Sequence, residues 1–176
     1  MDFKPSPQVE TLRERILDFI DEHLYPQERE IMAALDAEVA PGVPYPRILV
    51  EVREKAKSEG LWNLFMPDER FGPGLTNWEY GLLCEEMGRS PAAAPMVFNC
   101  AAPDTGNMEI LAEHGTPEQR ERWLEPLLEG RIRSCFLMTE PEVSGSDPTL
   151  LQARAVRDGD EWVIDGHKWF TSGAVG

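Results

Sequence analysis

The sequence predicts an α+β protein, with an N-terminal helical domain over residues 1–130 and an incomplete antiparallel β-barrel-like domain over residues 131–176. Two observations predict this order. Up to Gly130, apolar residues recur at the spacing of amphipathic helices in one segment after another. From Arg131 onward, short alternating or apolar runs are separated by Asp-Gly pairs, which is typical of strands joined by tight turns.

The first helix is predicted to begin at Ser6 and Pro7, a residue pair suited to the cap and first turn of a helix. The apolar residues that follow keep helical spacing beyond Pro26, so we expect a helix that bends there and runs on toward Leu35. A second amphipathic helix is predicted to end at Gly60, because glycine readily adopts the backbone conformation that closes a helix.

Two capping boxes predict where later helices begin. Thr76 is followed three residues later by Glu79, and Thr116 is followed at the same distance by Gln119. Between these two helices, Asp104 is predicted to cap another.

Several conspicuous residues of this helical part have interpretations that involve no chemistry. Trp78 and Trp123 fall at apolar positions of their helices, so packing in the core is favoured over contact with a ligand. The charge run from Glu118 to Glu125 is interpreted as a solvated helix face.

The β part is predicted to be a meander of three or four strands. Its candidate strands are residues 134–138, 151–155, 162–164 and 168–171. Asp158-Gly159 and Asp165-Gly166 are turn signals between them. Such a small sheet with an open edge is a poor end for a fold, so we expect only the first part of a larger β-domain.

Composition narrows the classes of function. The chain has 32 acidic and 17 basic residues, so its net charge of −15 disfavours nucleic acid and anionic membranes as partners. No stretch is long and apolar enough to predict a membrane span. The acidic N-terminal region resembles neither a signal nor a transit peptide, so a cytoplasmic location is expected, or the mitochondrial matrix in a eukaryote. The three cysteines and three histidines lack metal-ligand spacing, and no metal site is predicted.

The loop from Thr139 to Asp147 is the strongest candidate for a binding site. Its glycine and serines allow successive backbone N–H groups to face an anion, and the hydroxyls of Ser144 and Ser146 add donors, as a pyrophosphate requires. Many strand connections are rich in Ser and Gly, so the loop alone does not separate a phosphate nest from a plain turn.

The loop and its surroundings resemble a known family. Thr139-Glu140-Pro141, then Gly145-Ser146-Asp147, then the run from Gly159 through Lys168-Trp169-Phe170-Thr171-Ser172-Gly173 are similar to the middle domain of acyl-CoA dehydrogenases. Further matches, in the family's order, lie at residues 66–75, 85–89, 115–119 and 124–130. The resemblance covers nearly the whole chain, and it implies an N-terminal helical domain, a middle β-domain and a C-terminal four-helix bundle, of which the bundle is expected to be absent here.

The resemblance also implies an activity. Acyl-CoA dehydrogenases are FAD-dependent oxidoreductases of fatty acid metabolism and β-oxidation. They remove the α-proton and the β-hydrogen of a fatty acyl-CoA and pass the electrons to an electron-transferring flavoprotein, as homodimers or homotetramers. Their catalytic glutamate lies in the C-terminal domain. No catalytic residue is therefore assigned in this chain, and we expect it to be inactive alone.

Nine flavin-contact residues carry over from the resemblance: Phe136, Met138, Thr139, Gly145, Ser146, Trp169, Phe170, Thr171 and Ser172. The first three would line the flavin ring, and the last four would pack on it from a facing strand. Ser146, with Gly145 beside it, would contact the phosphate-ribityl side of FAD or the thioester arm of the substrate. Glu140 is interpreted as a structural residue rather than as the base.

Two departures from the commonest family pattern affect this assignment. Four residues separate Pro141 from Ser146 where three are usual, and the segment 168–171 is one residue shorter. The longer loop is closer to a less-studied branch that often acts on unusual or long acyl chains. Two alternatives stay open: a related FAD enzyme, such as an acyl-CoA oxidase, nitroalkane oxidase or flavin monooxygenase, and a non-catalytic truncated module that binds a partner.

Overall fold

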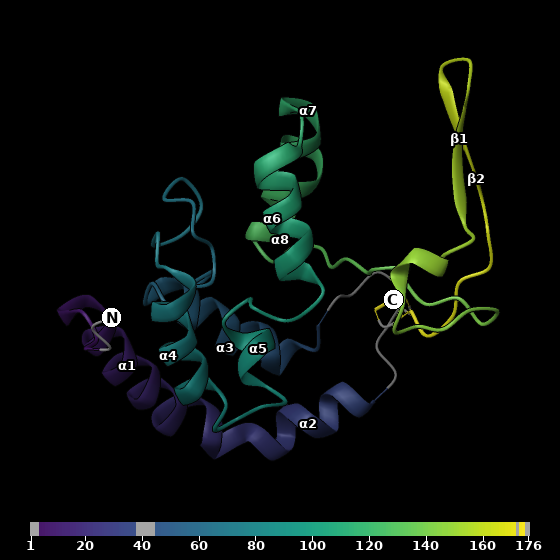
Figure 1. Cartoon of the computed structure of the whole chain (residues 1–176). Helices are drawn as coiled ribbons and strands as arrows, with labels where there is room; N and C mark the ends of the chain where they lie inside the picture. The colour runs from purple at the N-terminus through teal and green to yellow at the C-terminus, as the bar shows by residue number, and fades with distance from the viewer. Residues whose placement is uncertain (1–3, 38–44, 172, 175–176) are drawn as a thin grey trace. The chain divides into compact units, whose positions relative to one another are not determined.

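A computed structural model describes residues 4–37, 45–171 and 173–174 of the chain (Figure 1). Contacts divide the chain into two units, one up to Arg133 and one from Ser134 onward. The first unit contains only helices and the second contains the strands, so the predicted α+β class is confirmed.

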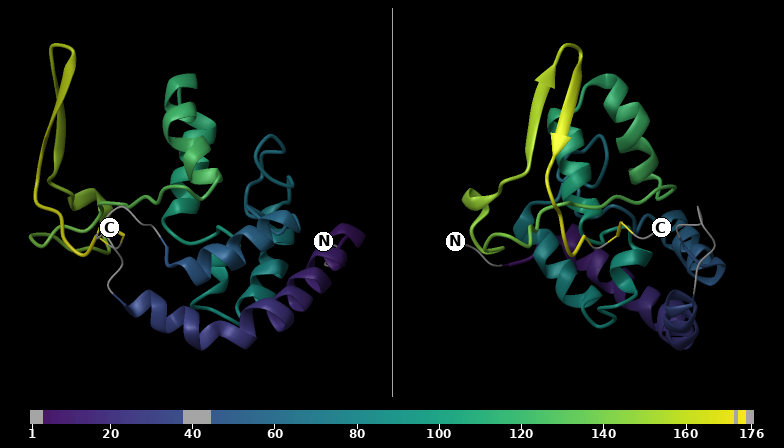
Figure 2. Two further views of the ribbon diagram at one scale, coloured as in Figure 1. Left: turned by 180° about the vertical axis from the view of Figure 1, so that it is seen from behind. Right: turned by 90° about the vertical axis from the view of Figure 1, so that its right-hand side faces the viewer.

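The first unit consists of helices and short helical turns. In chain order they are α1 (Pro7–Phe19), η1 (Ile20–Leu24), η2 (Tyr25–Gln27), α2 (Glu28–Asp36), α3 (Arg47–Ser58), α4 (Asn77–Met87), α5 (Ala94–Val97), α6 (Asp104–His114), α7 (Pro117–Gln119), η3 (Arg120–Leu124) and α8 (Glu125–Leu128). From α1 to α2 the helical path is nearly continuous and curved (Figures 1 and 2). It narrows to a 3₁₀ turn around Pro26, where the proline lacks the N–H that an α-helix needs, so the predicted bend is confirmed.

Helix caps follow the sequence at three of the four predicted positions. Ser6 Oγ accepts a hydrogen bond from an N–H in the first turn of α1, and both capping boxes, at Thr76 and at Thr116, are complete. The prediction for Asp104 is wrong, because Pro103 occupies the cap and Asp104 is the first helical residue. The Asp104 carboxylate is instead buried, 3.5 Å from the Nε of Arg133.

The core of this unit comprises two hydrophobic clusters. The larger gathers apolar side chains from α1, α3, α4 and α5, and the smaller joins Phe65 and Met66 to α6, η3 and α8. The prediction that Trp78 and Trp123 belong to this core is wrong, since they are 38% and 46% exposed. Trp123 lies in the π-helical turn η3, whose wider winding moves it off the face that α-helical spacing predicts.

Polar side chains also link elements of this unit. The guanidinium of Arg13 on α1 donates to Glu86 on α4, with Nη2 2.6 Å from Oε1. Arg53 is buried, with its Cζ 4.0 Å from the centre of the Tyr45 ring and 4.8 Å from that of Trp62.

The end of α8 is fitted around this buried arginine. Gly130 has a φ of 70°, in the left-handed region that favours glycine. A side chain at that position would collide with the guanidinium of Arg53 and place its Cβ 2.9 Å from Cζ2 of Trp62.

The second unit contains a 3₁₀ turn, η4 (Pro148–Leu150), and one antiparallel hairpin of β1 (Arg154–Asp158) and β2 (Glu161–Asp165). The hairpin turns through Gly159 and Asp160, with a φ of 60° at the glycine, so the turn predicted at Asp158-Gly159 forms one residue later and Asp158 ends β1. Both strands are exposed along their whole length, and in Figure 2 the hairpin projects from the loops of its own unit.

The predicted meander of three or four strands is wrong for the described residues. Residues 134–138 and 168–171 form no strand, and the two-stranded sheet does not close into a barrel. The N–H of Trp169 donates to the carbonyl of Thr139, the residue after the first segment, at 2.9 Å. Phe170 has a φ of 51°, and this left-handed residue interrupts the extended path that a strand needs. Within the described ranges, no helix is long and apolar enough to cross a membrane.

Candidate functional site

Two segments that are distant in sequence meet in the second unit. The N–H of Trp169 donates to the carbonyl of Thr139 over 2.9 Å, and the Nζ of Lys168 donates to the carbonyl of Met138 over 3.1 Å. These bonds join Thr139 to Trp169 and Met138 to Lys168. Met138, Thr139 and Trp169 are three of the residues assigned to flavin contact from the sequence.

The most distinctive surface of this unit is an aromatic pair. The rings of Trp169 and Phe170 stack with their centroids 4.4 Å apart and an angle of 20° between their planes. They are 53% and 74% exposed. Phe136 and Met138 are exposed as well. Exposed stacked rings offer a flat, polarisable apolar surface, which suits a planar aromatic ligand.

The Ser/Gly loop forms a tight turn near Thr139. The N–H of Asp147 donates to the carbonyl of Ser144, and the hydroxyls of Ser144 and Ser146 lie 2.9 Å apart. A Cβ at Gly145 would meet only Cγ2 of Thr139, at 4.0 Å. The contact between the hydroxyls uses one of their two hydrogens, so the other can serve an anion.

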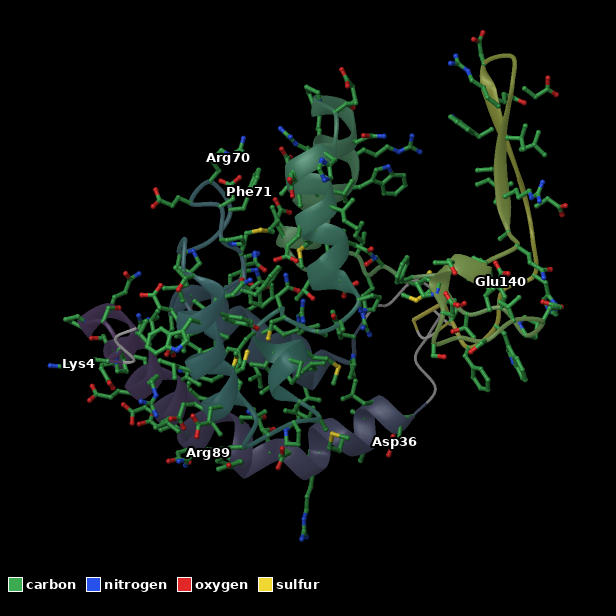
Figure 3. All side chains as sticks on the ribbon, viewed as in Figure 1. Lys4, Asp36, Arg70, Phe71, Arg89 and Glu140 are labelled. Carbon is green, nitrogen blue, oxygen red and sulfur yellow. The ribbon has the colours of Figure 1, made fainter. Side chains whose placement is uncertain are left out.

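Glu140 lies buried among the loops at the base of the hairpin (Figure 3). Its Oε2 accepts from the N–H of Gln152 at 2.6 Å, and its Oε1 accepts from the N–H of Ala153 at 2.9 Å and from the Nζ of Lys168 at 2.8 Å. The hydrogen bond from the Lys168 ammonium, followed by those from the two backbone N–H groups, lowers the pKa of Glu140 from 4.5 to about 2. A carboxylate held in this way suits a structural role and not that of a base.

The second acidic side chain of this loop is also engaged. Glu142 Oε1 lies 2.8 Å from Nδ1 of His167, and both side chains are exposed. Across the described ranges, no group of three or more His, Cys, Asp or Glu side chains is placed to hold a metal ion.

The structure thus gathers some predicted site residues and leaves others apart. Thr139 accepts the hydrogen bond from Trp169 and lies next to Gly145. The carbonyl of Thr171 accepts from the N–H of Ala174 at 3.3 Å. Ser172 lies outside the described residues.

Sequence reasoning missed the role of Lys168 and the backbone groups around Glu140. Lys168 belongs to the motif that carries the resemblance, but nothing in its spacing links it to a carboxylate 28 residues earlier. The backbone N–H groups of Gln152 and Ala153 leave no trace in a sequence, because every residue except proline has one.

Comparison with known proteins agrees with the order of the two units. The family model "Acyl-CoA dehydrogenase, N-terminal domain" matches residues 6–131, and "Acyl-CoA dehydrogenase, middle domain" matches residues 135–175. The first match alone covers more than half of the chain.

Individual relatives show the same similarity. "Acyl-CoA dehydrogenase family member 10" of Mus musculus is 51% identical over 175 residues, which cover 97% of this chain and 16% of the relative. The structure of a putative acyl-CoA dehydrogenase from Mycobacterium abscessus is 48% identical with a TM-score of 0.86, over 97% of this chain and 43% of that one. The fold is also shared by a glutaryl-CoA dehydrogenase from Mycobacterium smegmatis in complex with FADH2. That protein is 22% identical to this chain with a TM-score of 0.65, over 92% of this chain and 38% of that one.

This chain spans less than half the length of each of these proteins. Over that span the family models, the sequence identities and the fold agree, and they confirm the resemblance found in the sequence: the chain belongs to the acyl-CoA dehydrogenase family.

Proposed function

We propose that this chain supplies one wall of the FAD site of an acyl-CoA dehydrogenase that carries out α,β-dehydrogenation of a fatty acyl-CoA. The observation that carries the proposal is the hydrogen bond from Trp169 N–H to Thr139 O, because it joins the two segments that the resemblance assigns to flavin contact. The FAD dependence of the family supports it.

The residues present fit the chemistry of the cofactor. An isoalloxazine needs a flat apolar wall with a few fixed donors, and the exposed stack of Trp169 and Phe170 has this flat apolar character. Thr139 would face the polar edge of the ring, and Ser146 would contact the phosphate-ribityl side or the thioester arm of the substrate. When bound, FAD supplies the acceptor for the hydride that leaves the β-carbon of the acyl chain.

In this proposal the chain binds and orients but does not abstract the α-proton. Glu140 is buried against three donors, Glu142 is paired with His167, and Asp147 accepts from the backbone N–H and the hydroxyl of Thr149. All three carboxylates of the candidate loop are therefore engaged, and none is assigned as a base. We therefore expect this chain to be inactive in dehydrogenation when it is alone.

The proposal extends to the partners that the resemblance implies. They are a fatty acyl-CoA as substrate, an electron-transferring flavoprotein as electron acceptor, and identical subunits in a homodimer or homotetramer. The location would be the cytoplasm or the mitochondrial matrix.

The test is a titration of flavin fluorescence with the purified 176-residue chain and two tryptophan variants. Stacking of the flavin ring on Trp169 should quench the fluorescence saturably, and Trp169→Ala should weaken binding about tenfold. Trp162→Ala is the matched control, because Trp162 is similarly exposed, at 64%, but lies on β2.

Absence of saturable quenching by the wild-type chain, or an equal loss in both variants, would contradict the flavin site. Anaerobic addition of fatty acyl-CoA should leave the absorbance of the oxidised flavin unchanged. Bleaching by the substrate would show that the chain is active alone.

A further inference from the structure

We propose that Glu140 and Lys168 form a positioning pair, which holds the two segments that carry the candidate flavin wall, residues 138–140 and 168–171, at a fixed spacing. The inference rests on the proposed flavin site. The pair is assigned to act on the cofactor through its neighbours and not through a contact of its own.

The first argument is the burial and saturation of the carboxylate. Glu140 is 2% exposed and accepts three hydrogen bonds on its two oxygens, from the backbone of Gln152 and Ala153 and from the side chain of Lys168. The donors lie 12, 13 and 28 residues away in sequence. One side chain therefore ties the start of the loop to the base of the hairpin and to the second wall segment.

The second argument is that the side chain of Lys168 links its own segment to two residues of the other wall segment. Its ammonium donates to Oε1 of Glu140 at 2.8 Å and to the carbonyl of Met138 at 3.1 Å. The next residue, Trp169, donates its N–H to the carbonyl of Thr139 at 2.9 Å. Three consecutive residues of one segment, 138–140, are thus bonded to two consecutive residues of the other.

The third argument is that no buried apolar side chain among the described residues of the second unit could hold the two wall segments in place. Among the described residues of the second unit, Glu140 is the single buried side chain. Regular sheet hydrogen bonding is missing here too, because only one main-chain bond joins the two wall segments. The pair and its donors then determine where the Trp169 ring stands.

The chemistry of the site also requires a carboxylate. Three donors converge on the Glu140 side chain, and a glutamine would offer one oxygen and turn its own amide hydrogens toward them. Donors that face donors in a buried site lose their hydrogen bonds. Gly166 agrees with a close fit, since a Cβ there would collide with the Cβ of Ala153.

The competing interpretation is that Glu140 only secures the base of the hairpin through Gln152 and Ala153. Lys168→Met distinguishes the two interpretations. It leaves the hydrogen bonds of Gln152 and Ala153 to Glu140 in place, and it removes the hydrogen bonds of the ammonium to Glu140 and to Met138. Lys168→Arg keeps the charge and is the conservative variant. Glu142→Gln is the matched control, because its side chain is 51% exposed and lies in the same loop.

The first measurement needs no cofactor. Hydrogen exchange of the Trp169 amide is followed by NMR in the 176-residue chain and its variants. We expect exchange about tenfold faster in Glu140→Gln and in Lys168→Met, near wild-type exchange in Lys168→Arg, and no change in Glu142→Gln. Unchanged exchange at Trp169 in Lys168→Met would overturn the pair, even if Glu140→Gln fails to fold.

The second measurement is FAD binding together with the visible circular dichroism of the flavin. Lys168→Met should weaken binding about tenfold and alter the flavin spectrum, and Lys168→Arg should restore both. If the wild-type chain binds FAD and Lys168→Met binds it equally with the same spectrum, the positioning role is overturned and the flavin site stands. If the wild-type chain does not bind FAD, both proposals are overturned.

Discussion

The two units of this chain differ in the kind of side chain that they bury. Every buried apolar side chain in the described part of the chain belongs to the helical unit, in clusters around residues such as Phe19, Phe98 and Met108. The second unit, over the residues that the structure describes, buries one side chain, and it is the carboxylate of Glu140.

The two kinds of buried contact respond to different changes. Burial of hydrophobic area stabilises the first unit. The free energy that it contributes falls when a substitution leaves a cavity, but it depends little on charge. The buried contacts of the second unit, over the described residues, are hydrogen bonds to a carboxylate, and they respond to pH and to single-atom changes in the partners. Each prediction below perturbs one unit and leaves the other unit intact.

Removal of a buried ring from the helical core should have the largest effect. Phe98 is fully buried, with its ring centroid 5.5 Å from that of Phe19. Phe98→Ala should lower the free energy of unfolding by about 3–5 kcal/mol, measured by urea denaturation with circular dichroism. Ile110→Ala, at a position that is 58% exposed, should change it by about 0.5 kcal/mol or less. Equal losses would mean that the core does not carry the stability.

Loss of a partly buried ion pair should come next. Arg13→Met removes the guanidinium 2.6 Å from Glu86, whose side chain is 8% exposed, and should cost about 1–3 kcal/mol. Arg89, 3.4 Å from the other oxygen of Glu86, will soften the loss. Arg47→Met, which breaks an exposed pair with Glu51, is the control and should cost about 0–0.5 kcal/mol. A control as costly as Arg13→Met would refute the importance of burial.

Removal of one helix cap should have a smaller effect. In Thr116→Ala the hydroxyl that accepts from the N–H of Gln119 at 3.2 Å is lost. The free energy of unfolding should fall by about 1 kcal/mol, which thermal denaturation can detect. Thr116→Ser keeps the hydroxyl and should behave nearly as the wild type. A full loss in the serine variant would point to packing of the methyl group instead.

The response to acid should have the smallest effect on the stability of the whole chain, because it concerns only the second unit. The folded pKa of Glu140 is about 2, below its ordinary 4.5. Its bonds therefore stabilise this unit fully above about pH 4.5, and that contribution is lost as the pH falls toward about 2. The charged partner of Glu140 is Lys168, and the exposed contact between Glu142 and His167 belongs to the same loop.

NMR exchange of the Gln152 amide, followed from neutral pH to about pH 2, measures this loss locally. Glu140→Gln should remove the acid dependence and Glu142→Gln should keep it. A protected Gln152 amide at the acid end of the titration would contradict the assignment.

Much of the helical unit could be predicted from the sequence, because its signals are local. Ser6, Thr76 and Thr116 act on backbone groups within their own first turns, so a short motif is enough. The prediction failed at Trp123 because a π-helical turn shifts the helical phase, which no apolar pattern records.

The candidate site was less accessible to pattern reasoning. Its two segments came from the family resemblance, and the extra strands predicted there are not formed, since Phe170 takes a left-handed backbone. The links around Glu140 join residues 12 to 28 positions apart, and two of its donors are backbone groups. Periodicity has no means of encoding such contacts.

The close fit between Gly130 and Arg53 has a consequence for how this family can diverge. The guanidinium occupies the volume that a side chain at position 130 would need, and Trp62 closes the remaining side. The residue types at positions 53 and 130 therefore cannot change independently of each other in evolution. Homologues that carry a larger residue at position 130 should carry a smaller one than arginine at position 53, and an alignment of many sequences should reveal that pair as a covarying one.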